Sequence, residues 1–143
     1  MKDWLEELSV FAELYNRRIN NGRAYILWVD DNPFNNKDVI IDLQEKGIVV
    51  DLAITTDQGL KLFKEKEYAA IITDTSRGGK FDAGYQLCLT LQSKSDVPPV
   101  LLYSVEDTIK KYGHKYQKIG VKFMTSNCVE LRKKIFDIVG DAE

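Results

Sequence analysis

The sequence predicts a doubly wound α/β domain built on a five-stranded parallel sheet. Short apolar runs alternate with segments whose apolar residues recur at helical spacing, which is typical of successive βαβ units. Most of these runs are continuous rather than alternating, as expected for strands that helices cover on both faces. Three runs end directly in acidic or hydroxyl side chains, so polar chemistry is expected at one edge of the sheet.

Composition describes an ordinary globular protein. The 143 residues are 44% hydrophobic and 29% charged, and the formal net charge is −2. This charge gives no whole-chain reason to expect nucleic-acid or membrane binding. The first ten residues lack the basic region and long apolar run of a secretory signal, and no apolar stretch approaches membrane-spanning length. We therefore expect a cytoplasmic protein.

A helical extension is expected before the sheet. Apolar residues recur at helical spacing from Trp4 to Tyr15, and this segment runs out at Gly22. We expect residues 1–22 to form an N-terminal helical extension and residues 23–143 to form the main domain. The apolar stripe could pack on its own domain or form a dimer contact.

The first strand is expected over residues 24–29, ending in Asp30 and Asp31. Asn32 then supplies a capping residue and Pro33 a first helical position, which predicts a helix that stops at Gly47.

The second and third strands continue the alternation of strand and helix. A strand is expected over residues 48–54, and the sequence from Thr55 to Gln58 predicts a capping box at the start of a helix. The third strand, over residues 69–73, delivers Asp74.

The second half completes the pattern of five units. After a polar loop over residues 75–83, a helix carries Leu87, Cys88 and Leu91. The remaining elements are expected at 100–103 for a strand that ends at Ser104, 107–119 for a helix, 121–125 for a strand, and a final helix capped by Asn127 with Glu130.

Other reactive residues predict no separate site. Cys88 and Cys128 lie in predicted amphipathic helices and are interpreted as buried thiols. His114 lies in a polar helix and is interpreted as a surface residue, so zinc binding is not expected. The glycines around Gly78 and Gly84 do not form a nucleotide-binding fingerprint.

Polar side chains end several predicted strands. Asp30 and Asp31 end the first, Asp74 the third and Ser104 the fourth, and Ser126 follows the fifth. Parallel strands bring their carboxyl ends to one edge, where ligands bind in open α/β sheets. Clustered carboxylates favour a hard divalent cation such as Mg²⁺, and a carboxylate, a metal and a hydroxyl are what phosphoryl transfer needs.

Three segments of the chain resemble the signatures of response-regulator receiver domains of two-component signalling. The resemblance runs from about Arg23 to Val139 and implies the flavodoxin-like strand order 2-1-3-4-5 of chemotaxis regulators. The matching segments are 26–32 (ILWVDDN), 71–74 (IITD) and 99–104 (PVLLYS).

The resemblance implies a role for each residue of the pocket. It makes Asp74 the phosphoacceptor, Asp31 a direct Mg²⁺ ligand and Asp30 the acidic neighbour that orients metal or water. Ser76 would offer its backbone carbonyl to the metal. Ser104 matches the switch hydroxyl that bonds the phosphoryl group, and Phe123 matches the aromatic switch position.

The chain departs from the family pattern in two places. Receivers place a lysine and a proline just after the fifth strand, where Ser126 and Asn127 stand here. Lys122 lies at the amino-terminal end of that strand and is not expected to substitute. The loop after Asp74 is longer than usual, and Arg77 or Lys80 is a candidate to replace the lost charge.

The resemblance implies a stand-alone signalling domain. It would accept a phosphoryl group on Asp74 from a histidine kinase or phosphotransfer protein, with Mg²⁺, and signal through protein contacts near the fourth helix and fifth strand. We expect no enzyme beyond self-phosphorylation and self-dephosphorylation, no nucleic-acid or membrane partner, and a monomer or weak homodimer.

Two alternatives remain open. The lost lysine favours a phosphorylation-independent pseudo-receiver that acts as a binding module. A metal-dependent phosphohydrolase of the haloacid dehalogenase type is less favoured, because those enzymes need a second aspartate where Ser76 stands.

Overall fold

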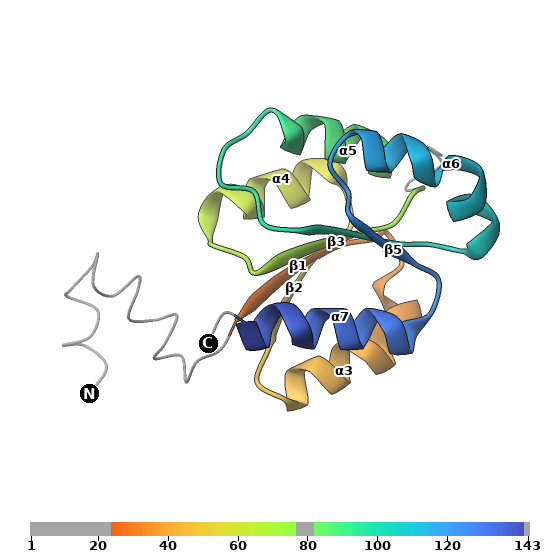
Figure 1. Ribbon diagram of the computed structural model, residues 1–143. Coiled ribbons are helices and arrows are strands. Elements are labelled where there is room, and N and C mark those ends of the chain that lie inside the picture. The colour runs from red at the N-terminus through yellow and green to blue at the C-terminus, as the bar shows by residue number, and fades with distance from the viewer. Residues whose placement is uncertain (1–23, 77–81, 142–143) are drawn as a thin grey trace.

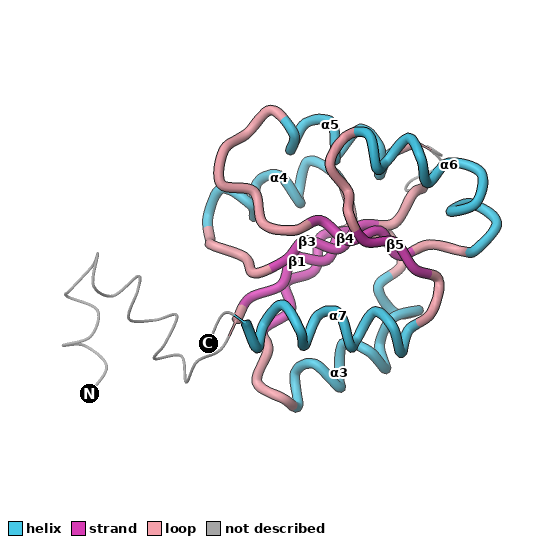
Figure 2. The backbone as a smooth tube through the Cα atoms, in the orientation of Figure 1, coloured by secondary structure: helices cyan, strands magenta, loops and turns pink. Residues whose placement is uncertain are grey.

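The computed structural model describes residues 24–76 and 82–141 (Figure 1). The predicted N-terminal helical extension, residues 1–22, lies outside the described residues. Within them, a central sheet separates two layers of helices, as Figure 2 shows in the orientation of Figure 1.

All neighbouring strands of the sheet run parallel, in the order β2-β1-β3-β4-β5. This confirms the predicted doubly wound α/β fold and its strand order. The strands are β1 (Tyr25–Val29), β2 (Val49–Ala53), β3 (Ala70–Thr73), β4 (Val100–Tyr103) and β5 (Phe123–Thr125).

Helices cover both faces of the sheet. The helices α3 (Lys37–Glu45) and α7 (Cys128–Asp141) lie on one face, and α4 (Thr56–Glu65), α5 (Ala83–Gln92) and α6 (Glu106–Lys118) lie on the other (Figure 2). Successive residues of β1 point to opposite faces. Ile26 and Trp28 therefore join the core under α3 and α7, whereas Leu27 and Val29 join the core under α4 and α5.

The helix after β1 begins differently from the prediction. Pro33 does start it, but the first turn, η1 (Pro33–Asn36), is a 3₁₀ helix that continues into α3. The Asn32 side chain makes no capping hydrogen bond. Its backbone N–H instead donates to the Asp30 carboxylate, which forms the local turn here. The predicted side-chain cap at Asn32 is therefore wrong.

Two other predicted helix ends, at Gly47 and Thr55, are confirmed with small changes. Gly47 adopts a φ of 87°, and Ile48 N–H bonds to the Leu43 carbonyl, which is the glycine-terminated end expected for α3. Thr55 caps α4 by accepting from Gln58 N–H, while the Gln58 side chain accepts from Ile54 N–H.

Two predictions in the last βα unit are corrected. The fifth strand begins at Phe123 rather than residue 121, because pairing with β4 starts at Leu101. Cys128 is exposed at the first turn of α7, so its predicted burial is wrong, whereas Cys88 is buried as predicted. His114 is exposed, as expected.

Among the described residues, no helix is both long enough and apolar enough to cross a membrane.

Candidate functional site

The site lies where the chain leaves neighbouring strands for opposite faces of the sheet. β1 leads into α3 on one face, and its neighbour β3 leads to α5 on the other (Figure 1). In open α/β sheets, ligands bind beyond the carboxyl ends of strands at such a reversal.

Asp30, Asp31 and Asp74, here called the acidic trio, meet just beyond these two strand ends. Pairing of Val29 with Thr73 brings the residues that follow β1 and β3 together, and Asp74 N–H bonds to the Val29 carbonyl at 3.3 Å. One carboxylate oxygen from each member lies within 4.8 Å of the others. Asp31 is exposed and its two companions are partly buried. The sequence therefore identified a group that the fold does bring together.

Two hydrogen bonds hold Asp30 in place. Its Oδ1 accepts from Asn32 N–H at 2.9 Å, and its Oδ2 accepts from the Asn36 side-chain amide at 3.0 Å. Asn36 is only 7% exposed, so its amide is committed to this contact. Sequence reasoning missed Asn36. The only signal was a polar residue one turn before the apolar face of α3.

A pair of hydroxyl groups lies beside the trio. Thr73 pairs with Leu102 across β3 and β4, and two residues beyond each of them Thr75 Oγ1 and Ser104 Oγ lie 3.0 Å apart. Thr75 is buried and Ser104 is partly buried. Ser104 therefore stands at the expected edge of the site with its hydroxyl held by a neighbour, a contact that the sequence did not predict.

Gly84 allows the backbone after β3 to pack closely on α5. A Cβ atom built at Gly84 would lie 2.0 Å from the Asp74 carbonyl oxygen and 3.0 Å from the Tyr116 hydroxyl. Gly84 N–H bonds to the Thr75 carbonyl at 3.0 Å. Because any larger residue would displace backbone, Gly84 is a site-shaping residue that sequence reasoning did not assign.

Ser126 follows β5, at the position where the resemblance to receiver domains leads us to expect a lysine. Ser126 is exposed there. The neighbouring Thr125 hydroxyl donates to Glu130 at 2.6 Å and accepts from Asn127 N–H at 3.0 Å. The Asn127 side chain caps α7 as predicted, but the Glu130 carboxylate binds Thr125 instead of closing the predicted capping pair.

The other residues that the sequence analysis singled out differ in their relation to the site. Phe123 is partly buried, with Lys134 Nζ 5.5 Å from its ring centroid. Ser76 lies two residues after Asp74 and is exposed, and its role as a carbonyl ligand stays a prediction. Arg77 and Lys80, the candidate replacements for the lost lysine, lie outside the described residues. Lys122 precedes β5, far from its carboxyl end.

The donor set of the acidic trio suits Mg²⁺. All three donors are carboxylate oxygens, which hard divalent cations prefer. Oxygens bound to one Mg²⁺ at 2.0–2.1 Å can be at most about 4.2 Å apart, and the trio spans up to 4.8 Å. Adjacent ligands of an octahedral ion are about 3 Å apart, so the three carboxylates would have to move closer by side-chain rotation to share one ion.

Comparison with protein families identifies this arrangement. Residues 26–130 match the response regulator receiver domain family. The chain belongs to this family. The matched region includes the acidic trio, Ser104 and Phe123, so the resemblance read from the sequence motifs is confirmed. A comparison with curated proteins found no match.

Solved structures show the same receiver fold. The chemotaxis response regulator CheY4 of Vibrio cholerae is 21% identical, with 81% of this chain and 98% of that chain covered at a TM-score of 0.68. A Francisella response regulator receiver domain is 20% identical, with 84% and 99% covered at 0.70. The response regulator TrrA from Thermotoga maritima, solved with Mg²⁺-BeF, is 23% identical, with 80% and 98% covered at 0.66.

Proposed function

We propose that Asp74 of this receiver domain accepts a phosphoryl group from a phosphohistidine of a histidine kinase or phosphotransfer protein, in the presence of Mg²⁺. The observation that carries this proposal is the convergence of the acidic trio within 4.8 Å, with the Ser104 hydroxyl on the next strand. A carboxylate nucleophile beside a cation site is the requirement for forming an acyl phosphate.

In the proposed step, an Asp74 carboxylate oxygen attacks the phosphorus of the donor. A P–O bond forms as the P–N bond to histidine breaks, and the imidazole nitrogen keeps the electron pair. Mg²⁺ held by the trio would neutralise charge on the phosphoryl oxygens. The two hydrogen bonds to Asp30 keep one carboxylate oriented for the metal, and the Ser104 hydroxyl leaves Thr75 to donate to a phosphoryl oxygen.

The proposed output is a change at the surface around β5. Ser104 N–H bonds to the Thr125 carbonyl at 3.2 Å, so movement at the end of β4 reaches β5 directly. Phe123 lies on that strand and packs against the core under α7. We therefore expect a downstream protein to read this face, with no ordinary enzymatic turnover.

A second function rests on Ser126. Its exposed hydroxyl stands where the family supplies a cation, so less charge is available to stabilise a phosphoryl group. Losing one such electrostatic donor commonly costs about 10²-fold in enzyme rates. A pseudo-receiver that binds its partner without phosphorylation is the function this observation favours.

Binding of beryllofluoride, a phosphoryl mimic, separates the two functions. With Mg²⁺ and beryllofluoride, fluorine NMR of the full chain should show protein-bound signals that depend on Mg²⁺. Asp74→Asn and Asp31→Asn should abolish or weaken them. Asp96→Asn is the matched control, because Asp96 is exposed and its φ of 57° is well tolerated by asparagine. A folded wild type with no bound signal would support the pseudo-receiver.

A further inference from the structure

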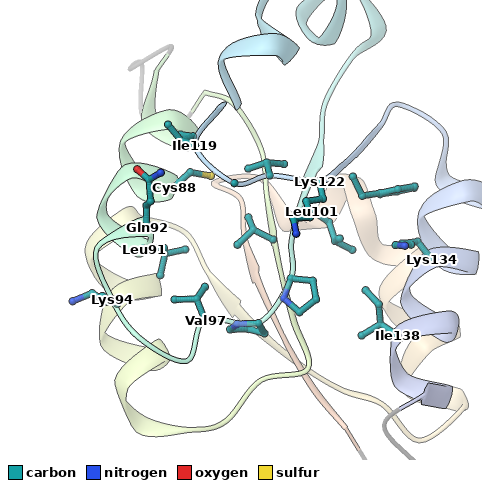
Figure 3. Close-up of a pocket in the computed structure, with 16 residues that line it drawn as sticks. Cys88, Leu91, Gln92, Lys94, Val97, Leu101, Ile119, Lys122, Lys134 and Ile138 are labelled. Atoms are coloured by element: carbon teal, nitrogen blue, oxygen red, sulfur yellow. The ribbon is translucent and has the colours of Figure 1, made fainter. Parts of the chain in front are cut away.

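A hollow lies at the opposite end of the sheet from the acidic trio. It has a volume of about 520 Å³ and lies at the amino-terminal ends of β4 and β5, between α5 and α7 (Figure 3). Its apolar lining includes Leu91 and Val97 near the end of α5, Val121 before β5 and Ile138 on α7. The buried Cys88 also lines it.

The short fifth strand leaves this hollow open. Pairing between β4 and β5 begins only at Leu101 and Phe123, so Val100 at the start of β4 faces the hollow. The chain reaches β5 through a turn at Gly120, where φ is 103°. The apolar edge of the sheet is therefore less covered here than elsewhere along β4.

The charged side chains that line the hollow are all positive. Lys94, Lys122 and Lys134 line it, with Lys94 and Lys134 on opposite sides in Figure 3. Among the described residues that line the hollow, none is acidic. An occupant with an apolar stripe and acidic flanks fits this surface better than a basic or uniformly polar one.

The amino-acid sequence before β1 contains such a segment. Trp4, Leu8, Phe11 and Tyr15 recur at the spacing of a helix that anchors in an apolar groove. Residues 1–15 contain four acidic side chains and one basic one. The acidic residues are Asp3, Glu6, Glu7 and Glu13.

The linker is long enough for this segment to reach the hollow. Ala24 begins the described chain at the amino-terminal edge of β1, and it packs on the same core cluster as Ile138. From β1 to β4 the sheet extends by two strand spacings, about 10 Å. Residues 17–23 can span about 23 Å when extended.

We propose that residues 4–15 dock into the hollow between α5 and α7 of the same chain, with Trp4, Leu8 and Phe11 against its apolar lining and the acidic side chains facing the three lysines. This docking is independent of phosphorylation at Asp74. It gives the N-terminal segment a defined place on the domain and covers the start of β4.

Thiol reactivity of Cys88 tests the proposal in the full-length chain. In a Cys128→Ser background, Cys88 is the single cysteine, and its rate of reaction with an aromatic disulfide reports access to the hollow. The paired changes Glu6→Lys with Glu7→Lys, or Lys94→Glu with Lys134→Glu, should each raise this rate about threefold to tenfold by removing ion pairs. Combining all four should restore the slow rate.

Matched variants control for unrelated effects. Lys61→Glu with Lys64→Glu reverses two exposed charges on α4 and should leave the Cys88 rate unchanged. Trp4→Ala with Phe11→Ala should raise the rate without changing any charge. Equal rates in all variants, or a quadruple variant that reacts fastest, would overturn the proposal. A Cys88 rate that depends on protein concentration would also overturn it, because the occupant would then be a second copy.

Discussion

Asn36 determines how Asp30 is presented to the cation site. Its amide is buried and donates to Oδ2 of Asp30, while the backbone of Asn32 holds Oδ1. A carboxylate fixed by two donors loses less freedom when it takes part in binding a metal. The contact therefore serves the geometry of the site as well as its stability.

A double-mutant cycle measures how much the hydrogen bond between Asn36 and Asp30 contributes to the free energy of unfolding. We expect Asn36→Ala to lower the free energy of unfolding by about 1–3 kcal/mol, because a partly buried carboxylate loses its donor. In an Asp30→Ala background the same change should cost at least about 1 kcal/mol less. Urea unfolding of the four proteins without metal measures both values. Equal costs in the two backgrounds would show that the amide contact contributes nothing.

The residues of this site show which of its features the sequence could predict. Asp30, Asp31, Asp74 and Ser104 were found because each ends a predicted strand, and parallel strands bring such positions to one edge. Asn36 was missed because its contact depends on the exact turn that follows β1. A 3₁₀ turn there has no strong sequence signature beyond Pro33.

At the level of elements, the start of α5 packs closely against the residue that follows β3. Gly84 lies on the first turn of α5, directly against the Asp74 carbonyl. No side-chain adjustment can relieve the clash that a methyl group would cause there, because the contacted atom belongs to the backbone. The start of α5 is therefore tied to the position of Asp74.

Two Gly→Ala substitutions distinguish the close packing at Gly84 from the general effect of alanine on helix stability. Gly84→Ala should destabilise the protein by about 1–3 kcal/mol, as overpacking does. Gly140→Ala, in α7 with open space around it, should be neutral or stabilising by up to about 1 kcal/mol. Urea unfolding of both variants measures the difference. Equal effects would mean that α5 can move away from Asp74 at little cost.

A partly buried hydrogen bond links the edge strand β2 to the segment before β3. The Tyr68 hydroxyl donates to Asp51 at 2.7 Å, and Lys66 pairs with the same carboxylate at 2.9 Å. Burial, and next the hydrogen bond to Asp51, raise the pKa of Tyr68 above its ordinary value of 10.0. The folded state therefore favours the neutral phenol.

This shift predicts a loss of stability in alkaline solution. Below pH 10 the phenol is protonated in both states, so it adds no pH dependence. Above pH 10 the unfolded state ionises first, and the free energy of unfolding falls by at most about 1.4 kcal/mol per pH unit. Comparing wild type with Tyr68→Phe from pH 8 to 11 isolates this effect. The same slope in both proteins would contradict the assigned cause.

The ends of strands and helices were harder to predict than the order of these elements along the chain. Gly47 and Thr55 carry local chemistry that ends or starts a helix, so those ends were predicted well. The start of β5 depends on where β4 offers a partner, which is a tertiary property. The exposure of Cys128 depends on the rotation of α7 and likewise has no local signal.

At the scale of the whole molecule, one sheet holds two separate surfaces. The carboxyl ends of β1 and β3 carry the acidic trio, whereas the amino ends of β4 and β5 carry the lysine-lined hollow. The alternation of apolar runs and amphipathic helices predicted the elements of this fold, and the resemblance to receiver domains supplied the strand order. The hollow had no sequence signature because residues from several elements form it.

The most direct test of the proposed function is the intact mass of the full chain after incubation with Mg²⁺ and acetyl phosphate, beside Asp74→Asn. The account predicts a phosphate-sized adduct on the wild type alone, lost when Mg²⁺ is removed. That result would show that Asp74 is the acceptor and that the family's lysine is dispensable here. A folded wild type without an adduct, or an adduct that persists in Asp74→Asn, would contradict the account.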